Sequence, residues 1–140
     1  MTEEQVFQAK LKHLDYIENT ISRMHQASQS IKQWTCLIVS GLLACYGDRE
    51  GKKLLLVAAS VSIVMSFLDA SYLFSERKYR KLYDDVAGIR RVNGDIELFD
   101  MSTQRYEHHS LCFLNALISK SVLLFYLPVI IALVVFYCVI

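Results

Sequence analysis

The sequence contains only one proline and five glycines in 140 residues, and charged residues make up only 21% of it. Proline and glycine are the residues that most often end helices and form turns, so long helices with few breaks are expected. The formal net charge is only +1. Such a balance argues against a general nucleic-acid binder, which carries a clear excess of positive charge.

Side chains in a pattern that supports catalysis are also missing. The cysteines are Cys36, Cys45, Cys112 and Cys138, all in or beside apolar segments. Without ligand-like spacing, they are interpreted as small buried hydrophobic residues. His108 and His109 are adjacent, so on a helix they diverge by about 100° and cannot share a metal. No phosphate-binding glycine loop and no nucleophile–base pair is visible, and we expect no enzyme activity, no cofactor and no metal site.

Long apolar runs, by contrast, are plentiful, and hydrophobic residues make up 54% of the chain. The clearest run is residues 121–140, SVLLFYLPVIIALVVFYCVI, which carries no charge. As a helix it would reach about 30 Å, the thickness of the hydrocarbon core of a bilayer. The chain is therefore predicted to be an integral membrane protein.

The charged residues cluster outside the apolar segments and so mark the limits of the remaining helices. The predicted fold is an all-α membrane protein, and we expect it to assemble as a homo-oligomeric helical bundle. The expected parts are a cytoplasmic amphipathic or coiled-coil helix at 1–33, transmembrane helices at 34–46, 54–74 and 119–140, and a cytoplasmic linker with a basic tract and an ordered loop at 75–110. A helix capped by Asp100 or Ser102 is expected to continue unbroken into the third span.

The first of these spans is short. The uncharged run between Lys32 and Asp48 covers about 22 Å of helix against about 30 Å of hydrocarbon. Either Lys32 extends to the membrane surface, or the segment lies among other helices. No helix breaker precedes this span, so the N-terminal helix is expected to run straight into it.

The N-terminal helix has an apolar seam with a seven-residue repeat. One row is Phe7, Leu14, Ile21 and Ser28, and the second is Lys10, Ile17, Met24 and Ile31, with Leu11 beside them. This pattern is typical of a coiled-coil or bundle helix. The alternative is a helix lying on the membrane surface, but the seam is narrow and the opposite face carries acids as well as bases, which favours assembly.

A polar stripe follows another face of the same helix. Its members recur at spacings of three or four residues: Asp15, Glu18, Ser22, Gln26, Gln29, Gln33, Cys36, Ser40 and Ala44. Such a face is able to line an oligomeric pore with a cation-attracting vestibule. The same small residues also suit close helix packing, so pore lining and packing both remain open.

Asp69 is the unusual residue of the second span, because a carboxylate facing lipid is costly. It shares a helix face with Ser62 and Ser66. A water-filled path would explain this polar face. The alternative is a packing contact, for example with Lys120 or a tyrosine hydroxyl.

A basic tract follows the second span. The candidate partner- or lipid-binding residues are Arg77, Lys78, Arg80, Lys81, Arg90 and Arg91. Anchoring to anionic membrane lipids is the first interpretation. An anionic partner such as a nucleotide or single-stranded nucleic acid is the alternative, and no sequence-specific nucleic-acid recognition is expected.

Orientation follows from counting Lys and Arg. Residues 1–33 contain four, residues 75–110 contain seven, and the short loop after the first span contains three. The positive-inside rule places the N-terminus and the 75–110 segment in the cytoplasm and the C-terminus outside. The expected location is the plasma membrane, which the family resemblance given below implies is a bacterial inner membrane.

Several of these segments also form a familiar pattern. They are SRM and IKQW in the first helix, LIVSGLLA in the first span, FLDASYLFSERKYRKLYDDV at the end of the second span, and a lone third span. The pattern resembles the small bacterial SLATT-like membrane effectors of anti-phage defence, particularly those of Hailong-type systems. The residues that carry the resemblance are Asp69, Tyr72, Glu76, Arg77, Arg80, Tyr83 and Asp84. The third span departs from the plain two-span layout of that family.

The resemblance implies a homo-oligomeric ion channel, taken as a tetramer, that a cognate nucleotidyltransferase and its oligonucleotide product hold silent. Release would depolarise the membrane and arrest growth. We expect the pore to be lined by the polar stripe together with Ser62, Ser66 and Asp69. The alternative is a non-conducting oligomeric anchor or scaffold for a partner enzyme.

Overall fold

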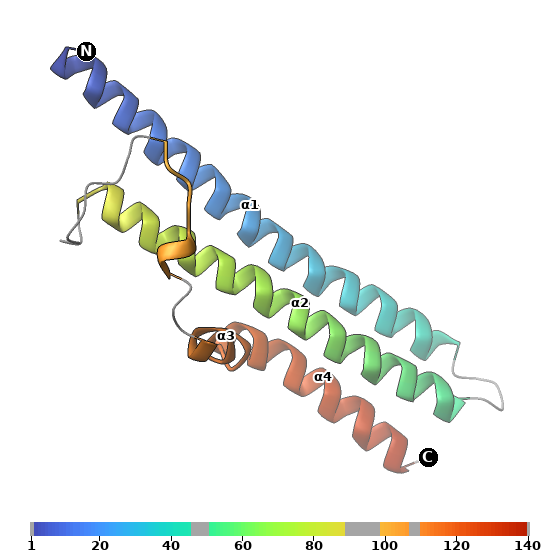
Figure 1. Cartoon of the computed structure of the whole chain (residues 1–140). Helices are drawn as coiled ribbons and strands as arrows, with labels where there is room; N and C mark the ends of the chain where they lie inside the picture. Colours follow the sequence, from blue (N-terminus) through green and yellow to red (C-terminus); the bar gives the residue numbers. More distant parts are fainter. Residues whose placement is uncertain (1, 46–50, 89–98, 107–109, 140) are drawn as a thin grey trace.

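The computed structural model of the chain is entirely helical over the residues that it describes, which are 2–45, 51–88, 99–106 and 110–139. Four α-helices follow one another as α1 (Glu3–Ala44), α2 (Gly51–Val86), α3 (Ser110–Leu117) and α4 (Lys120–Val139), with a 3₁₀ turn, η1 (Gln104–Tyr106), before α3. Figure 1 shows α1 and α2 as two long antiparallel rods, with α4 alongside one half of α2.

Helix α1 runs through the predicted cytoplasmic helix and the predicted first span without a break. At its start, the side chain of Gln5 accepts a hydrogen bond from the backbone N–H of Thr2 at 3.1 Å. Glu3 and Glu4 lie in the first turn, where the helix dipole stabilises negative charge. No proline follows, and the first glycine is Gly41. The continuous helix expected from the lack of breakers is confirmed.

Two apolar clusters hold α1 against α2. Near the N-terminal half, Ile17 is fully buried and packs with Leu82 and Val86 of α2. At the other end, Val39 packs with Leu55 and Ala58 of α2 and with Leu133 of α4. The apolar seam of the N-terminal helix is therefore used largely within one chain. Its first positions, Phe7, Lys10 and Leu11, stay exposed.

Helix α2 does not end with the second span. It continues through the basic tract to Val86, so the predicted cytoplasmic linker begins about three helical turns later than position 75. Gly88 follows with φ +76, a left-handed conformation that glycine adopts at the ends of helices without steric cost. Arg90 and Arg91 lie outside the described residues, as does the greater part of the predicted ordered loop, of which only the end from Phe99 onward is described.

The prediction of one unbroken helix, capped by Asp100 or Ser102 and continuing into the third span, is wrong. Asp100 accepts a hydrogen bond from the backbone N–H of Ser102 at 2.9 Å, which closes a turn and not a helix. Helix α3 ends at Leu117, where Ser119 donates from its backbone to the carbonyl of Ala116 at 3.1 Å. Helix α4 then starts at Lys120 in a new direction (Figure 1).

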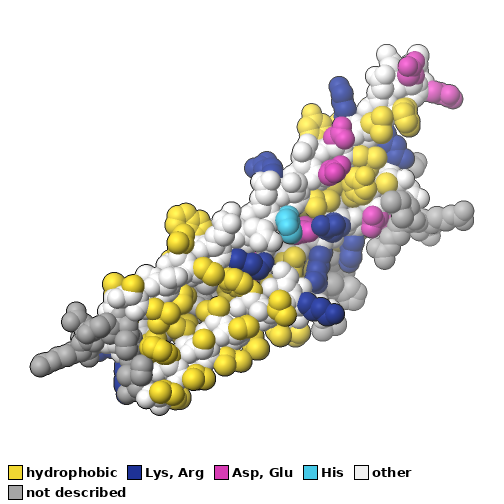
Figure 2. Space-filling view, turned by 180° about the vertical axis from the view of Figure 1, so that it is seen from behind, with side chains coloured by type: hydrophobic (Ala, Val, Ile, Leu, Met, Phe, Trp, Pro, Cys, Tyr) yellow, Lys and Arg dark blue, Asp and Glu magenta, His cyan; other side chains and the backbone are white. Residues whose placement is uncertain are grey.

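Among the described residues, two helices are long and apolar enough to cross a membrane, α2 and α4. The last charged residue of α1 is Lys32, which leaves only a short uncharged stretch before the helix ends at Ala44. The hydrophobic side chains visible in Figure 2 gather over the half of the molecule that contains α4, and the charged ones over the other half. The coarse prediction of an all-α chain with membrane-spanning helices agrees with this arrangement.

The cysteines differ from expectation. Cys36, Cys45 and Cys138 are free and exposed on the single chain, so the prediction that they are buried is wrong within one chain. Cys36 and Cys138 lie on helix faces that the described part of the chain leaves uncovered, Cys45 follows the last residue of α1, and the side chain of Cys112 lies outside what the structure describes.

Candidate functional site

A buried carboxylate occupies the place where α1, α2 and α4 meet. The side chain of Asp69 on α2 has no exposed surface. Its Oδ1 accepts a hydrogen bond from the hydroxyl of Ser28 on α1, and its Oδ2 lies 3.0 Å from the Nζ of Lys32, one helical turn further along α1. Asp69 therefore forms an ion pair with Lys32 inside the helix packing.

Lys32 connects this carboxylate to the third helix. Its ammonium donates to the hydroxyl of Ser28 at 3.1 Å and to the hydroxyl of Ser121 on α4 at 3.3 Å. Only 12% of its side chain is exposed. A buried charge of either sign is stable only when it is paired and hydrogen-bonded. We name Ser28, Lys32, Asp69 and Ser121 the junction cluster.

The structure also shows where the junction cluster lies along the helices. Asp69 is about 27 Å along α2 from Gly51, and Ser121 stands at the start of α4, which is about 28 Å long. Both helices thus extend from the cluster over a length close to the hydrocarbon thickness of a bilayer. The cluster marks one end of the apolar half of the molecule.

A second buried carboxylate lies seven residues beyond Asp69 on α2. Glu76 is 5% exposed, and its Oε1 accepts hydrogen bonds from the Nε and Nη2 of Arg80 at 2.9 and 2.7 Å. Its Oε2 lies 3.7 Å from the Nδ1 of His25 on α1. The spacing of seven places Asp69 and Glu76 on one face of α2, the face that packs on α1.

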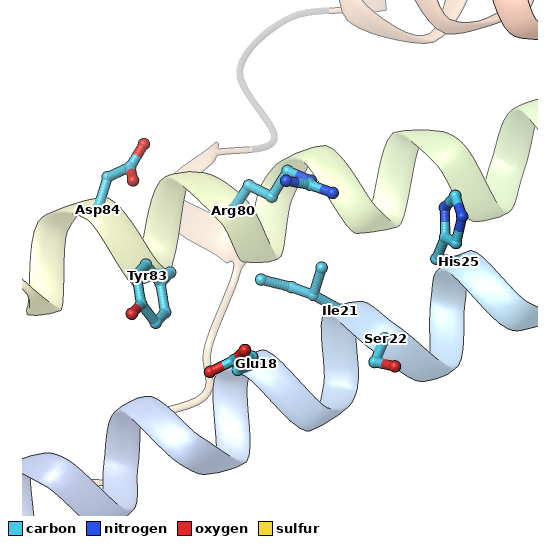
Figure 3. A pocket seen from close by; sticks show the side chains of 7 residues that line it. All are labelled: Glu18, Ile21, Ser22, His25, Arg80, Tyr83 and Asp84. Carbon is cyan, nitrogen blue, oxygen red and sulfur yellow. The ribbon is translucent and has the colours of Figure 1, made fainter.

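A groove between α1 and α2 begins beside Glu76. It has a volume of about 570 Å³. It is lined by Glu18, Ile21, Ser22, His25, Arg80, Tyr83 and Asp84, and Figure 3 shows the first four projecting from α1 and the last three from α2. The lining holds two carboxylates and one guanidinium, so it does not favour ligands of one charge sign.

The predicted pore residues separate into two groups. The polar stripe of α1 lies on the surface of the single chain: Asp15, Glu18, Ser22, Gln26, Gln29, Gln33, Cys36 and Ser40 are all exposed. Ser62 and Asp69 are fully buried, and the half-buried Ser66 donates to the carbonyl of Ile63 in its own helix at 2.8 Å. The structure therefore does not bring Asp69 onto the same surface as the stripe.

The basic tract is divided in a similar way. Arg80 pairs with Glu76, whereas Arg77 extends to the α3–α4 junction, where it donates to the hydroxyl of Ser119 at 3.1 Å and to the carbonyl of Asn115 at 3.4 Å. The ammonium of Lys78 lies 4.4 Å from the centre of the Phe74 ring. The tract is a set of helical side chains with different neighbours and not one uniform basic surface.

Sequence reasoning missed the partners of Asp69. Lys120 and a tyrosine hydroxyl were the suggested contacts, while Ser28, Lys32 and Ser121 are the observed ones. One signal was available, because Lys32 is the last charge before the uncharged part of α1 and Asp69 is the only charge within the second predicted span. Two lone opposite charges in neighbouring apolar segments are candidates for a pair.

Within the described part of the chain, no three His, Cys, Asp or Glu side chains converge to hold a metal ion. The junction cluster matters chemically in two ways. It can fix the register of three helices, and breaking its ion pair would leave a buried charge unpaired between them. The sequence matches no protein-family model, and comparison with curated proteins and with solved structures gave no significant match.

Proposed function

We propose that this chain is a SLATT-like membrane effector of bacterial anti-phage defence, acting as a gated homo-oligomeric ion channel. In this proposal the open channel depolarises the inner membrane and arrests growth. The N-terminus lies in the cytoplasm and the C-terminus outside.

One observation supports this proposal most strongly. The apolar seam of α1 is largely covered by α2 of the same chain, while the polar stripe on its other side is exposed from Asp15 to Ser40. Because the apolar side of α1 is already packed, its exposed polar side is left to contact either water or the polar side of another copy of α1.

The third crossing, by the end of α1, is supported by its neighbours. Val39 packs against Leu55, Ala58 and Leu133, which belong to the two helices that are apolar enough to cross. A segment wedged between two spanning helices shares their depth, so the part of α1 after Lys32 would lie inside the bilayer. Within hydrocarbon, Gln33 cannot face lipid cheaply, and several copies of α1 arranged around a path would satisfy it, whereas the hydroxyl of Ser40 already donates to the carbonyl of Cys36 in its own helix.

The charges along the stripe suggest the kind of ion. Asp15 and Glu18 are exposed on the part of α1 that extends beyond the apolar half. In an oligomer they would form an acidic ring, which raises the local concentration of cations at the mouth of a pore. The proposed channel therefore prefers cations, and the resemblance suggests a tetramer.

Gating belongs to the same proposal and rests on the resemblance. A cognate nucleotidyltransferase and its oligonucleotide product would hold the channel closed through the cytoplasmic part, where the basic tract lies. The junction cluster would transmit such a signal, because it ties the cytoplasmic and the apolar parts of α1 and α2 to α4.

A non-conducting anchor or scaffold for a partner enzyme is the second candidate, and one observation favours it. The hydrogen bonds and ion pair of Asp69 come from within one chain, so this carboxylate does not require a water-filled path. Under this alternative the polar stripe is a packing face between copies.

The test is the current through planar bilayers that contain the purified protein, compared with two substitutions on α1. Gln33→Leu removes a polar group from the stripe. Ser30→Leu is the matched control, because Ser30 is also exposed but lies off the stripe. A channel lined by the stripe gives a cation-selective current that Gln33→Leu reduces and Ser30→Leu does not. A defined oligomer without current, also after removal of residues 1–20, supports the scaffold.

A further inference from the structure

A small cationic pocket lies on the side of α2 that faces α3 and η1, away from the junction cluster. Its volume is about 210 Å³, and its lining residues are Phe74, Arg77, Lys78, Lys81, Tyr106 and Asn115. Among the described residues, this lining holds three cations and no carboxylate. The groove of Figure 3, in contrast, includes both Glu18 and Asp84.

The cations are arranged by the helix itself. Phe74, Arg77, Lys78 and Lys81 follow at spacings of three, one and three, so they lie on one face of α2 over two turns. Arg77 is oriented by its bonds to Ser119 and Asn115, and Lys78 by the ring of Phe74. A guanidinium and two ammonium groups around one small cavity have the chemistry that recognises a phosphate group.

The depth of this pocket in the bilayer follows from its contacts with the start of α4. Ser119 comes directly before Lys120, the first residue of α4, and Asn115 lies in the helix α3 that leads to it; α4 is the more apolar of the two helices able to cross a membrane. If α4 crosses the membrane, the pocket lies at the level of the lipid headgroups. Figure 2 shows Lys and Arg side chains gathered at the border of the hydrophobic half.

Apolar side chains for a lipid tail stand next to the pocket. Leu114 and Ile118, on either side of Asn115 in the chain, are 52% and 65% exposed. Helix α3 is turned away from the line of α4 (Figure 1), and the described part of its sequence bears no charge. A short apolar helix at this depth is suited to lie in the membrane surface with its apolar side chains among the acyl chains.

We infer that this pocket binds the phosphate headgroup of an anionic phospholipid, with the acyl chains against Leu114 and Ile118. Arg77 and Lys81 bind the phosphate oxygens, and Tyr106 closes the cytoplasmic side. The inference depends on the membrane placement in the proposed function, but not on ion conduction.

The test is native mass spectrometry of the full chain in detergent, with equal amounts of phosphatidylglycerol and phosphatidylcholine added. We expect preferential retention of phosphatidylglycerol, by about tenfold, because binding of anionic headgroups is dominated by the cations. Arg77→Gln and Lys81→Gln should each remove most of this preference. Lys12→Gln, which removes an exposed charge from α1 far along the chain from the pocket, is the matched control and should keep it.

Three results would overturn the inference. One is equal retention of both lipids by the unchanged protein, and another is an unchanged preference in Arg77→Gln and Lys81→Gln. The third comes from adding soluble glycerol phosphate, because full displacement of the lipid at equal concentration would mean that the pocket takes free phosphate esters. A protein that conducts ions without lipid preference would contradict this inference alone, whereas a lipid-binding protein without current would contradict only the channel.

Discussion

Breaking the ion pair of the junction cluster is expected to cost more stability than the loss of one surface contact. The substitutions are Lys32→Met and Asp69→Asn, which nearly conserve volume, together with the double substitution. At 3.0 Å between Nζ and Oδ2, the attraction is about 5 kcal/mol for an effective dielectric constant of about 20. Desolvation of the two charges offsets a large part of this value.

The two single substitutions should lower the free energy of unfolding by different amounts. Lys32→Met leaves the fully buried Asp69 with Ser28 as its remaining partner, and we expect a loss of about 3 kcal/mol. Asp69→Asn leaves an ammonium whose side chain is already 12% exposed and is able to extend toward water. Its cost should therefore be smaller, about 1–2 kcal/mol.

The double substitution should cost less than the sum of the two, because it leaves no unpaired charge. We expect a coupling energy of about 2 kcal/mol. Reversible unfolding in a mild detergent, followed by circular dichroism, measures all four proteins. Ser60→Ala is the control, since Ser60 is exposed and, among the described residues, its hydroxyl donates to the carbonyl of Leu56 in its own helix, and its effect should stay within about 0.5 kcal/mol. Additive effects of Lys32→Met and Asp69→Asn would refute the ion pair.

Three further substitutions, and one control substitution of a glycine, test the packing. Ile17→Ala should lower the free energy of unfolding by about 2–5 kcal/mol, because a fully buried side chain leaves a cavity between α1 and α2; a change below about 0.5 kcal/mol would show that this contact is absent. Gly88→Ala should destabilise the end of α2 by about 1–2 kcal/mol, because φ is +76 there, whereas Gly41→Ala within α1 should not destabilise a single chain, since a Cβ meets nothing within 4 Å. Tyr106→Phe removes the hydrogen bond to Asp85 on α2, and hydrogen exchange over 99–106 should become faster; unchanged exchange would contradict the docking of η1.

The long helices were predictable because they depend on local rules. A capping sequence at Thr2, the lack of proline before position 128 and the seven-residue apolar repeat suffice to predict a helix that continues past Lys32. The repeat also predicts a packed seam. What it cannot specify is the partner, because a second helix of the same chain and a second copy bury the same side chains equally well.

The contacts of the candidate site depended on information that is not local. Pairing of Asp69 with Lys32 requires a particular register between α1 and α2, and a shift by one residue would point one of them elsewhere. The break at Ser119 was missed because serine is tolerated inside helices, and the direction of α4 is set by packing on α2. The separation of Arg77 from Arg80 likewise follows from what surrounds each face of α2.

We propose that the polar stripe of α1 lines an ion path, and Cys36 allows a direct test. Its thiol lies on the stripe and is free and exposed. A positively charged methanethiosulfonate reagent, added to planar bilayers containing the open protein, should reduce the current of the unchanged channel. Cys36→Ser, which keeps the other three cysteines, should be resistant to the reagent. Equal block of both proteins, or no block of either, would contradict the account.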